Sequence, residues 1–337
     1  MAFVRGVVPA IASFVFPGLG DAIAGRTRWA LGWALAVPIA MALVFVSVWM
    51  FFVAFVLRIA AMISAGVSSS RAERLEWFGA WPVVIACISI GTFMALRMFV
   101  VEGFKAPSSS MYPTLQIGDH VFVDKLSPHW HAIERGEVVV VQNPCNPEIE
   151  YLKRVVALGG DTVEIRCNVL YVNGAAVPAT LVSAAARYQD YDDQNGRWYA
   201  KACSRYHEVL DGHGYDVFHD SERPARDARG AAEGDVRDFP RLGLAIPPSC
   251  RDAAYGRPVS QPEGKLVVTK PAAGACERQL YYVVPDGSAF VLGDNRYNSN
   301  DSRYWGPAAV DKIRGRVFAI WLGGSPDGTD WSRIGSL

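Results

Sequence analysis

The feature that most constrains this chain is a run of 29 residues without a charge, residues 29–57, which ends before Arg58. A helix rises about 1.5 Å per residue, so this run exceeds the roughly 30 Å of hydrocarbon in a bilayer. It predicts a membrane span that tilts or kinks at Pro38. A second uncharged run, residues 78–96, is 19 residues long and follows Trp77, a residue typical of the membrane interface. Both runs therefore predict passage through a membrane.

The membrane region predicted from these runs covers residues 1–101, with spans at about 29–57 and 78–100. Two buried core helices of a soluble protein are the alternative, and the length of the runs argues against it. Residues 6–25 are also apolar, but they are broken at Pro17 and Gly18. We expect a re-entrant or interfacial segment there, with a third span as the alternative.

The orientation of the spans follows from the arginines beside them. Arg71 and Arg74 lie between the two runs, and loop arginines favour the cytoplasm, so the chain after Val101 would lie on the opposite side. Arg26 and Arg28 oppose this orientation if there are only two spans. A third span, or a division of the long run into two, would remove the conflict, so the sequence leaves the number of spans open.

Composition and pattern narrow the class of the remaining chain. With 51% apolar residues and 33 basic against 33 acidic side chains, the chain is neither disordered nor a general nucleic-acid binder. From residue 102 onward, short β-branched segments alternate with Gly, Pro, Asn and Asp, which predicts an all-β domain. The expected strands are 120–123, 137–142, 151–158, 162–165, 170–172, 266–269, 281–284, 290–292 and 316–322.

One segment of this β domain departs from the pattern. Residues 175–265 are polar and rich in Asp, Arg and Gly, and His207 to Phe218 reads as a hairpin. We expect an accessory β and loop insertion there, between two parts of a β catalytic core, 102–174 and 266–337.

The cysteines predict disulfides without their pairing. Cys87 lies in the second apolar run, and five more follow it without a C-x-x-C spacing, which gives no support to a zinc site. In an oxidising compartment one or two disulfides are expected. The candidates for pairing are Cys145, Cys167, Cys203, Cys250 and Cys276.

Three segments concentrate reactive side chains. Residues 104–115 hold three consecutive serines in a turn bounded by prolines, and residues 151–161 place Lys153 inside an apolar strand. Residues 293–306 form a loop dense in Gly, Asn, Ser and Asp, too polar for a core and too specific for a linker.

Together these segments resemble the bacterial type I signal peptidases, membrane-anchored Ser-Lys proteases that cleave signal peptides. The resemblance rests on the P-S-x-S-M-x-P-T box, the Gly118-Asp119 pair, the strand with the K-R pair and the G-D-N-R-x-x-S-x-D-S-R box, in that order. It leaves the first 60 residues and the 175–265 insertion largely uncovered. It implies N-terminal transmembrane helices followed by a signal-peptidase-like all-β catalytic domain.

The resemblance also implies roles for individual residues. Ser110 would be the nucleophile and Lys153 the general base, with the Ser108 hydroxyl and the Ser110 backbone N–H as oxyanion donors. Ser299 would orient the lysine. The remaining supporting residues would brace the loop: Asp294, Asp301, Arg303 and Arg154.

The chemistry expected of Lys153 can be argued independently. A serine hydroxyl needs an adjacent base, and a lysine with a pKa near 10.4 is neutral in only about one molecule in a thousand near pH 7.5. Burial among apolar neighbours such as Leu152 and Val155 would lower that pKa. Strand alternation would then point Arg154 to the other face. An exposed strand lysine paired with Asp or Glu is the alternative, and the serine box and the 293–306 loop argue against it.

Other chemistries find less support. A Ser-His-Asp triad would need one of the six histidines, but no G-x-S-x-G elbow is present. His129 and His131 form an isolated H-x-H pair in a loop, which is more often solvated than metal-bound. We therefore expect neither a metal nor another cofactor.

The expected substrate is a precursor protein whose signal peptide ends in small residues, A-x-A-like, before the cut. Ser110 follows Leu96 by only 14 residues, which places catalysis close to the membrane surface. The resemblance implies shallow apolar pockets reached by strand addition. Candidate lining residues are Met111, Leu115, Val139 and Val141.

The expected partners are such precursors, the lipid bilayer and the translocation machinery, with no nucleic acid. The expected location is the cell (inner or plasma) membrane, multi-pass, with the catalytic domain on the exoplasmic or periplasmic side. Two alternatives stay open: a self-cleaving Ser-Lys protease of the LexA type, which the membrane spans argue against, and a non-catalytic membrane-tethered β-domain that binds peptides or partner proteins.

Overall fold

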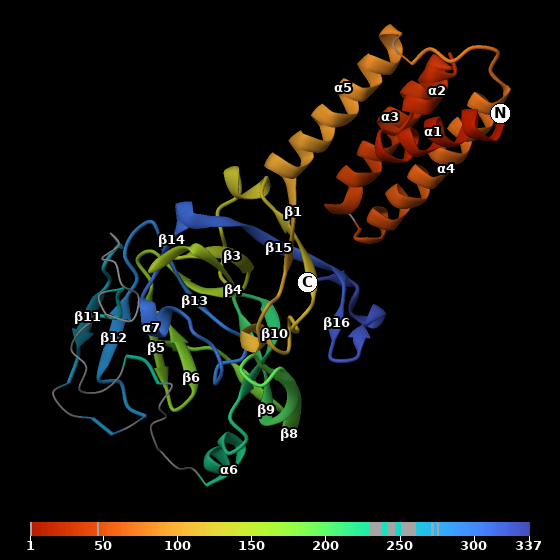
Figure 1. The fold of residues 1–337 in the computed structure, drawn as a ribbon. Helices are drawn as coiled ribbons and strands as arrows, with labels where there is room; N and C mark the ends of the chain where they lie inside the picture. The colour runs from red at the N-terminus through yellow and green to blue at the C-terminus, as the bar shows by residue number, and fades with distance from the viewer. Residues whose placement is uncertain are drawn as a thin grey trace. The chain divides into compact units, whose positions relative to one another are not determined.

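The computed structural model describes residues 2–45, 47–77, 79–229, 238–240, 247–250, 261–270, 273–274 and 276–337. The chain divides into two compact units, one of residues 1–102 with 319–321 and 334–337, the other of residues 103–318 and 322–333. The first is mainly helical and the second mainly β (Figure 1).

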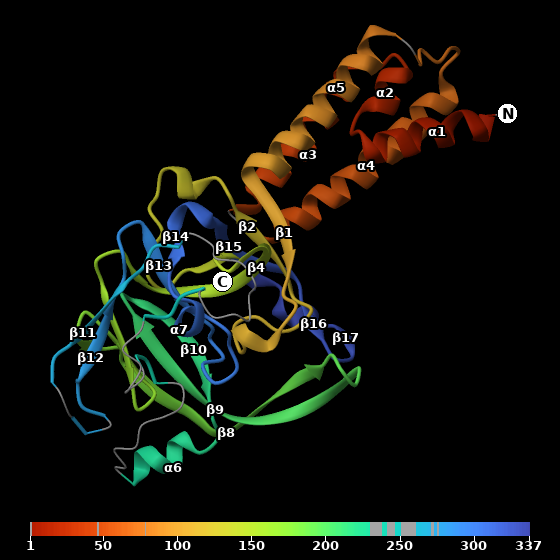
Figure 2. The same cartoon turned by 60° about the vertical axis from the view of Figure 1, so that its left-hand side comes forward.

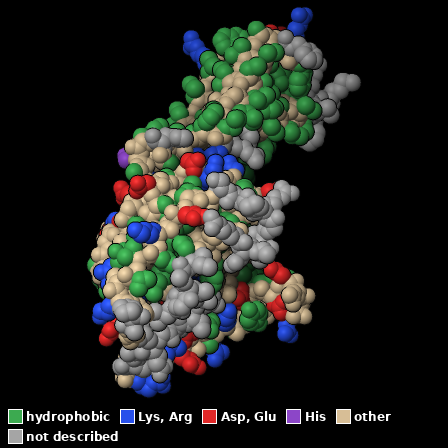
Figure 3. Space-filling view, turned by 90° about the vertical axis from the view of Figure 1, so that its left-hand side faces the viewer, with side chains coloured by type: hydrophobic (Ala, Val, Ile, Leu, Met, Phe, Trp, Pro, Cys, Tyr) green, Lys and Arg blue, Asp and Glu red, His purple; other side chains and the backbone are tan. Residues whose placement is uncertain are grey.

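The helical unit consists of α1 (Ala2–Val15), α2 (Leu19–Ile23), α3 (Thr27–Ala42), a 3₁₀ turn (Leu43–Phe45), α4 (Trp49–Arg71) and α5 (Ala80–Ala95), which continues as a π-helical turn (Leu96–Val100). Large hydrophobic side chains remain exposed along these helices, and they cover much of the visible helical surface in Figure 3. Apolar patches of this extent mark a surface that meets something other than water.

The run over residues 29–57, expected as one span with a division into two as the alternative, is divided in the structure between α3 and α4. The physical reason is packing: α3 and α4 contact each other, and each buries a row of small residues that includes Ala34 on α3 and Ala61 on α4. Arg58, expected to end the span, lies inside α4 and donates a hydrogen bond to the Phe14 carbonyl at 3.0 Å.

By length and composition, α4 is the one helix in the described part of the chain that could cross a membrane, with a mean hydropathy of 2.2. Residues 6–15 and 80–92 form shorter apolar helices. The segment predicted over 78–100 is therefore helical, but its α-helical part has 16 residues.

The β unit contains an eight-stranded sheet in the order β1-β2-β15-β3-β4-β13-β14, with β18 paired to β15. Its main strands are β1 (Val101–Lys105), β2 (His120–Asp124), β3 (Val138–Asn143), β4 (Asn146–Leu158), β13 (Ser288–Leu292), β14 (Ala308–Ala309) and β15 (Ile313–Leu322). A five-stranded sheet has the order β11-β12-β5-β6-β7, with β5 (Thr162–Arg166), β6 (Val169–Val172), β7 (Ala175–Ala176), β11 (Lys265–Val268) and β12 (Leu280–Val283). All nine expected strands are confirmed to within a few residues.

Two short pairs complete the described strands, namely β16 (Gly324–Ser325) with β17 (Gly328–Thr329), and β18 (Gly335–Ser336) with β15. Among the described residues of this unit, helix is confined to short elements such as α6 (Arg223–Ala228) and α7 (Ser302–Trp305). The predicted all-β class of the catalytic domain is thus confirmed.

The described part of the insertion has more regular structure than the sequence suggested. A long hairpin of β8 (Ala179–Asp192) and β9 (Arg197–Leu210) continues into β10 (His213–His219), as Figure 2 shows. The predicted hairpin within 207–218 is confirmed: Leu210 pairs with His213 around a two-residue turn, Asp211-Gly212, with positive φ at both positions.

The insertion also shares its core with the rest of the β unit. Tyr206 and Val217 pack in the same buried cluster as Val156 and Phe290. A bridge from Ile165 to Phe239 and another from Phe218 to Asn295 join its backbone to the flanking segments. The insertion is therefore built into the packing of the domain.

Two disulfides tie distant parts of the β unit together, Cys145–Cys250 and Cys167–Cys276. The first joins the β3–β4 turn to the insertion. Cys203 is a buried free thiol and Cys87 an exposed one. The sequence left one or two bridges and their partners open, because pairing depends on which loops meet in space.

Candidate active site

The three serines lie on a short turn that the backbone anchors at both ends. Ser108 is extended, and residues 109–111 form a 3₁₀ turn. Before the turn, the Ala106 N–H donates to the Asp119 carbonyl at 2.8 Å, and the Gly118 N–H donates to the Ala106 carbonyl at 2.9 Å. The Gly118-Asp119 pair thus closes the loop that presents the serines.

The hydroxyl of Ser110, on this turn, faces the amine of Lys153. Lys153 lies on β4, and its Nζ is 2.8 Å from the Oγ of Ser110. The same Nζ donates to the carbonyl of Leu152 at 3.0 Å, and it lies 5.0 Å from the centre of the Tyr151 ring. The ammonium is therefore held by its own strand while it faces the hydroxyl.

Burial changes the acid–base behaviour of this lysine. Its side chain is 2% exposed, and burial lowers the pKa of Lys153 to about 8, although the charges of Asp301 and Asp294 act in the opposite direction. A neutral amine next to a serine hydroxyl can accept the hydroxyl proton. The two groups can therefore act as base and nucleophile.

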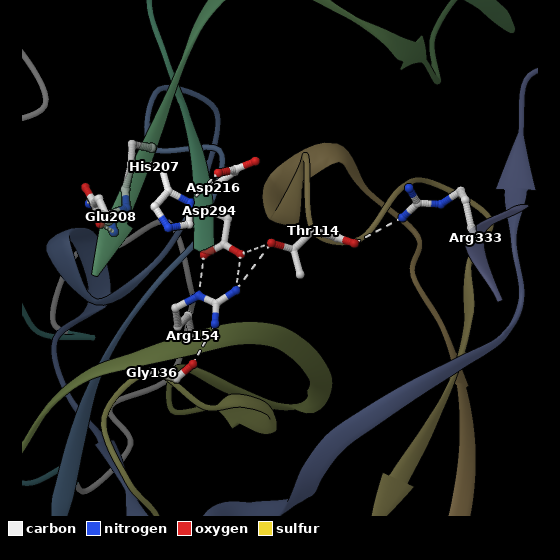
Figure 4. Close-up of polar contacts among 9 residues, drawn as sticks. Thr114, Gly136, Arg154, His207, Glu208, Asp216, Asp294 and Arg333 are labelled. Carbon is white, nitrogen blue, oxygen red and sulfur yellow. Dashed lines mark hydrogen bonds and ion pairs between the residues drawn. The ribbon is translucent and has the colours of Figure 1, made fainter. Parts of the chain in front are cut away.

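Arg154 points away from Lys153 and forms a second buried polar group, drawn in Figure 4. Its guanidinium donates to both carboxylate oxygens of Asp294, at 2.8 and 2.6 Å, and to the Gly136 carbonyl at 2.5 Å. The Thr114 hydroxyl donates to Asp294 at 2.5 Å. The ring of Tyr215, on β10, lies 3.9 Å from this guanidinium. This ion pair joins the end of the serine box to the 293–306 loop.

Asp301 and Arg303 form another buried pair. The Nε and Nη2 of Arg303 each donate to Asp301 at 2.8 Å, and the Gly293 N–H donates to the same carboxylate at 3.0 Å. Burial by itself raises the pKa of the Asp301 carboxyl, but the Arg303 charge and these hydrogen bonds hold it below its usual range. Asp301 therefore stays ionised and fixes the loop against β13.

Ser299 lies next to the nucleophile without bonding the lysine. A Cβ at Gly293 would collide with the Ser299 hydroxyl and with the Ser110 carbonyl, which shows how closely these segments approach. Ser299 is 5% exposed, and the structure has no hydrogen bond between its hydroxyl and Lys153, both described residues. Its orienting role stays a prediction.

The expected oxyanion donor Ser108 is exposed, and its hydroxyl donates to the Ser110 Oγ at 3.3 Å. The role of Ser108 therefore also stays a prediction.

The four expected pocket residues are all buried. Met111 and Leu115 are 2% and 0% exposed, and Val139 and Val141 are both 0% exposed. The two valines belong to a core cluster with Val155. These side chains lie beneath the surface of the domain, and none of them offers an open face in this structure.

Sequence reasoning missed two asparagines that hold the serine turn. The Asn295 N–H donates to the Ser110 carbonyl at 3.0 Å, and its side-chain amide donates to the Ser109 carbonyl at 3.1 Å. The Asn298 amide donates to the Ser109 hydroxyl at 3.0 Å. Both belong to the G-D-N-R box, so the available signal was the high Asn content of that loop.

Among the described residues, no three His, Cys, Asp or Glu side chains gather in a way that could hold a metal ion.

Comparison with known proteins shows the family of this chain. The family model described as "Signal peptidase, peptidase S26" matches residues 75–239 and 251–322. A signal peptidase I of Aquifex aeolicus (strain VF5) is 30% identical over 229 residues, which cover 68% of this chain and 78% of that protein. A signal peptidase I of Pseudomonas fluorescens is 28% identical over 255 residues, which cover 68% of this chain and 67% of that protein.

The fold and site thus define a serine peptidase with a β catalytic domain. The chain belongs to the signal peptidase family, peptidase S26. A solved signal peptidase I from Enterococcus faecalis V583 is 21% identical and covers 55% of this chain and 97% of its own, with a TM-score of 0.26, which is too low to add to the argument.

Proposed function

We propose that this chain removes signal peptides from exported precursor proteins, with Ser110 as nucleophile and Lys153 as general base. The observation that carries the proposal is the 2.8 Å contact between the Ser110 Oγ and a fully buried lysine amine whose pKa is lowered to about 8 by burial. The signal peptidase I relatives support the substrate class.

In the first half-reaction, the Ser110 Oγ attacks the carbonyl carbon of the scissile bond while its proton passes to the Nζ of Lys153. The Ser110 N–H and the Ser108 hydroxyl stabilise the negative oxygen of the tetrahedral intermediate. The C–N bond then breaks, and the leaving amine takes the proton from the lysine. This leaves the signal peptide esterified to Ser110.

In the second half-reaction, a water molecule loses a proton to the neutral Lys153 and attacks the ester. Collapse of this intermediate breaks the bond to the Ser110 Oγ, which regains its proton from the lysine. The Asp301–Arg303 and Arg154–Asp294 pairs keep the loops in place throughout the reaction. Each pair is buried, and two hydrogen bonds join its members.

The substrate would reach this site as an extended strand with small residues before the cut. The expected pocket residues Met111, Leu115, Val139 and Val141 are buried in this structure, so a substrate would contact them only after the surface above them opens. The short sequence distance from Leu96 to Ser110 supports catalysis near the membrane surface. We infer a multi-pass protein of the cell membrane whose catalytic domain faces the exoplasmic or periplasmic side, with the bilayer and the translocation machinery as further partners.

The experiment that tests the function is cleavage of a precursor with an A-x-A-ending signal peptide by detergent-solubilised full-length chain. Ser110→Ala and Lys153→Met are each expected to abolish cleavage, since each removes a reacting group. Ser221→Ala and Lys312→Met, at exposed positions, are the matched controls and are expected to cleave normally. Near-normal cleavage by Lys153→Met would rule out the lysine as base. A wild type that binds the peptide without cutting it would favour a non-catalytic binding domain.

A further inference from the structure

The hairpin of β8 and β9, residues 179–210, lies outside the four motif segments and yet reaches the serine turn. Two of its side chains, Tyr188 and Asp190, are only 6% and 7% exposed, whereas the intervening Gln189 is exposed. The two-residue period of a strand places Tyr188 and Asp190 on one face. Because both side chains are buried, this face of the hairpin packs against the rest of the domain.

Asp190 acts on the serine turn through one amide. The Nδ2 of Asn298 donates one hydrogen bond to the Ser109 hydroxyl at 3.0 Å and another to the Asp190 carboxylate at 2.9 Å. An amide nitrogen has two hydrogens, so both bonds can form at once. The Tyr191 N–H and the Tyr199 hydroxyl also donate to Asp190, at 3.1 and 3.3 Å, which holds the carboxylate in place.

The negative charge of Asp190 decides which way this amide faces. With the Asn298 side chain flipped, its carbonyl oxygen would face the carboxylate and be repelled. With the amide nitrogen toward Asp190, the bond is charge-assisted and stronger than a neutral one. The second N–H is then fixed on Ser109, the residue before the nucleophile.

Aromatic packing also holds the hairpin against the serine turn. The Tyr188 ring lies 5.2 Å from the ring of Tyr112, which follows the catalytic turn, and it stacks on Phe218 at 5.6 Å. Burial raises the pKa of the Tyr188 hydroxyl, and side-chain hydrogen bonds with Asn295 and Asn298 oppose that rise. The Tyr188 hydroxyl therefore lies next to Asn295 and Asn298, the two asparagines that hold the serine turn.

A buried ion pair provides a separate tie between the hairpin and the motif loop. Arg296, two residues before Asn298, donates to both carboxylate oxygens of Glu208 on β9, at 3.0 and 2.5 Å. The two side chains are 3% and 1% exposed. Separating such a pair would leave an uncompensated buried charge, so hairpin and loop stay together.

We propose that Asp190 is a positioning residue for the cleavage reaction. It orients Asn298, which holds Ser109, and in this way it keeps the Ser110 hydroxyl against Lys153. The inference rests on the proposed function, because it concerns the geometry of that nucleophile and base. A displacement of about 1 Å at a reacting group can cost about 100-fold in rate, so a group that only orients another can have a large effect.

The test compares Asp190→Ala, Asn298→Ala and the double variant in precursor cleavage, with kcat and KM measured separately. Loss of a hydrogen bond to a charged group predicts a fall in kcat of about 10- to 100-fold for either single variant. KM is expected to stay the same, because Asp190 is buried and bonded to Asn298. The double variant is expected to be no slower than the slower single variant, since both changes break one chain of contacts.

Asp193→Asn, on the same hairpin but exposed, removes the same charge and is expected to match the wild type. Asp190→Asn keeps an oxygen that can accept from Asn298, so we expect it to retain more activity than Asp190→Ala. If thermal unfolding shows that Asp190→Ala does not fold, Asp190→Asn carries the test, and a several-fold loss of kcat at unchanged KM is the expected result.

The outcomes separate this inference from the proposed function. A wild type that neither cleaves the precursor nor gives an acylation burst with p-nitrophenyl acetate refutes the proposed function, and the positioning role with it. An active wild type with an unaffected Asp190→Ala, or with single effects that multiply in the double variant, overturns only the positioning role. A change confined to KM would also overturn it.

Discussion

The pKa of Lys153 makes the proposed mechanism testable by pH. Only the neutral amine can take the Ser110 proton, so the rate follows the fraction of neutral lysine. With a pKa of about 8, roughly one molecule in ten is neutral at pH 7, whereas the ordinary value of 10.5 would leave about one in 3000. We expect kcat/KM to rise about tenfold per pH unit below pH 8 and to level off above about pH 9.

The same shift affects the stability of the fold. Below pH 8, Lys153 is protonated in both the folded and the unfolded chain. Between pH 8 and 10.5 only the unfolded chain holds the proton, so the free energy of unfolding rises with pH across this window. A Lys153 pKa lowered from 10.5 to about 8 corresponds to about 3 kcal/mol. Above 10.5 the lysine is neutral in both states and the gain is complete.

The assay measures unfolding of the wild type and of Lys153→Met between pH 7 and 11, beside cleavage over the same range. The wild type is expected to gain about 3 kcal/mol relative to Lys153→Met as pH rises from 8 to 10.5, since methionine cannot titrate. Lys312→Met, which removes an exposed lysine, serves as control and should show no such change. A constant difference between wild type and Lys153→Met, with cleavage still increasing at pH 10, would refute a lowered pKa.

Three further predictions concern the groups around the dyad. Ser108→Ala is expected to lower kcat by about 10²–10³, the usual effect of losing one oxyanion donor, measured by steady-state precursor cleavage. Asp294→Asn leaves the buried Arg154 without its counter-charge and should lower the free energy of unfolding by about 3–5 kcal/mol in a urea titration. Replacing Cys145 and Cys250 together by serine opens a loop of 105 residues and should cost about 2–5 kcal/mol in the same titration.

Each of these has an outcome that contradicts it. An unchanged rate in Ser108→Ala would remove its hydroxyl from the oxyanion site and leave the nucleophile in place. The control for Asp294→Asn is Asp311→Asn, which removes one member of an exposed ion pair. A loss of stability of equal size in Asp311→Asn would show that burial is not the cause of the loss. If the free energy of unfolding of the wild type is the same under reducing and oxidising conditions, the disulfide contributes nothing to stability.

Local patterns predicted much of this protein because they report local physics. Alternating β-branched residues between turn formers predicted all nine expected strands, and residues 207–218 were recognised as a hairpin. The structure of the long apolar run, residues 29–57, was harder to predict. Hydropathy measures how apolar a segment is, but the division into α3 and α4 comes from packing between helices, which a window average does not contain.

The candidate site shows the same limit. Ser110 and Lys153 could be selected because each lies in a recognisable local pattern, a serine turn and an apolar strand. The partners of Asn298 could not be foreseen, since Asp190 is 108 residues away in a segment that reads as polar insertion. The two disulfides are also long-range, with separations of 105 and 109 residues.

By itself, then, the sequence determined the reactive groups, the strands and the apolar character of the N-terminal helices, because these depend on residue type and on near neighbours along the chain. Only the tertiary structure decided that Lys153 is fully buried 2.8 Å from Ser110, and that the hairpin face of Tyr188 and Asp190 lies on the serine turn. The physical reason is that burial, a shifted pKa and a charge-assisted hydrogen bond all depend on residues that meet only when the chain folds.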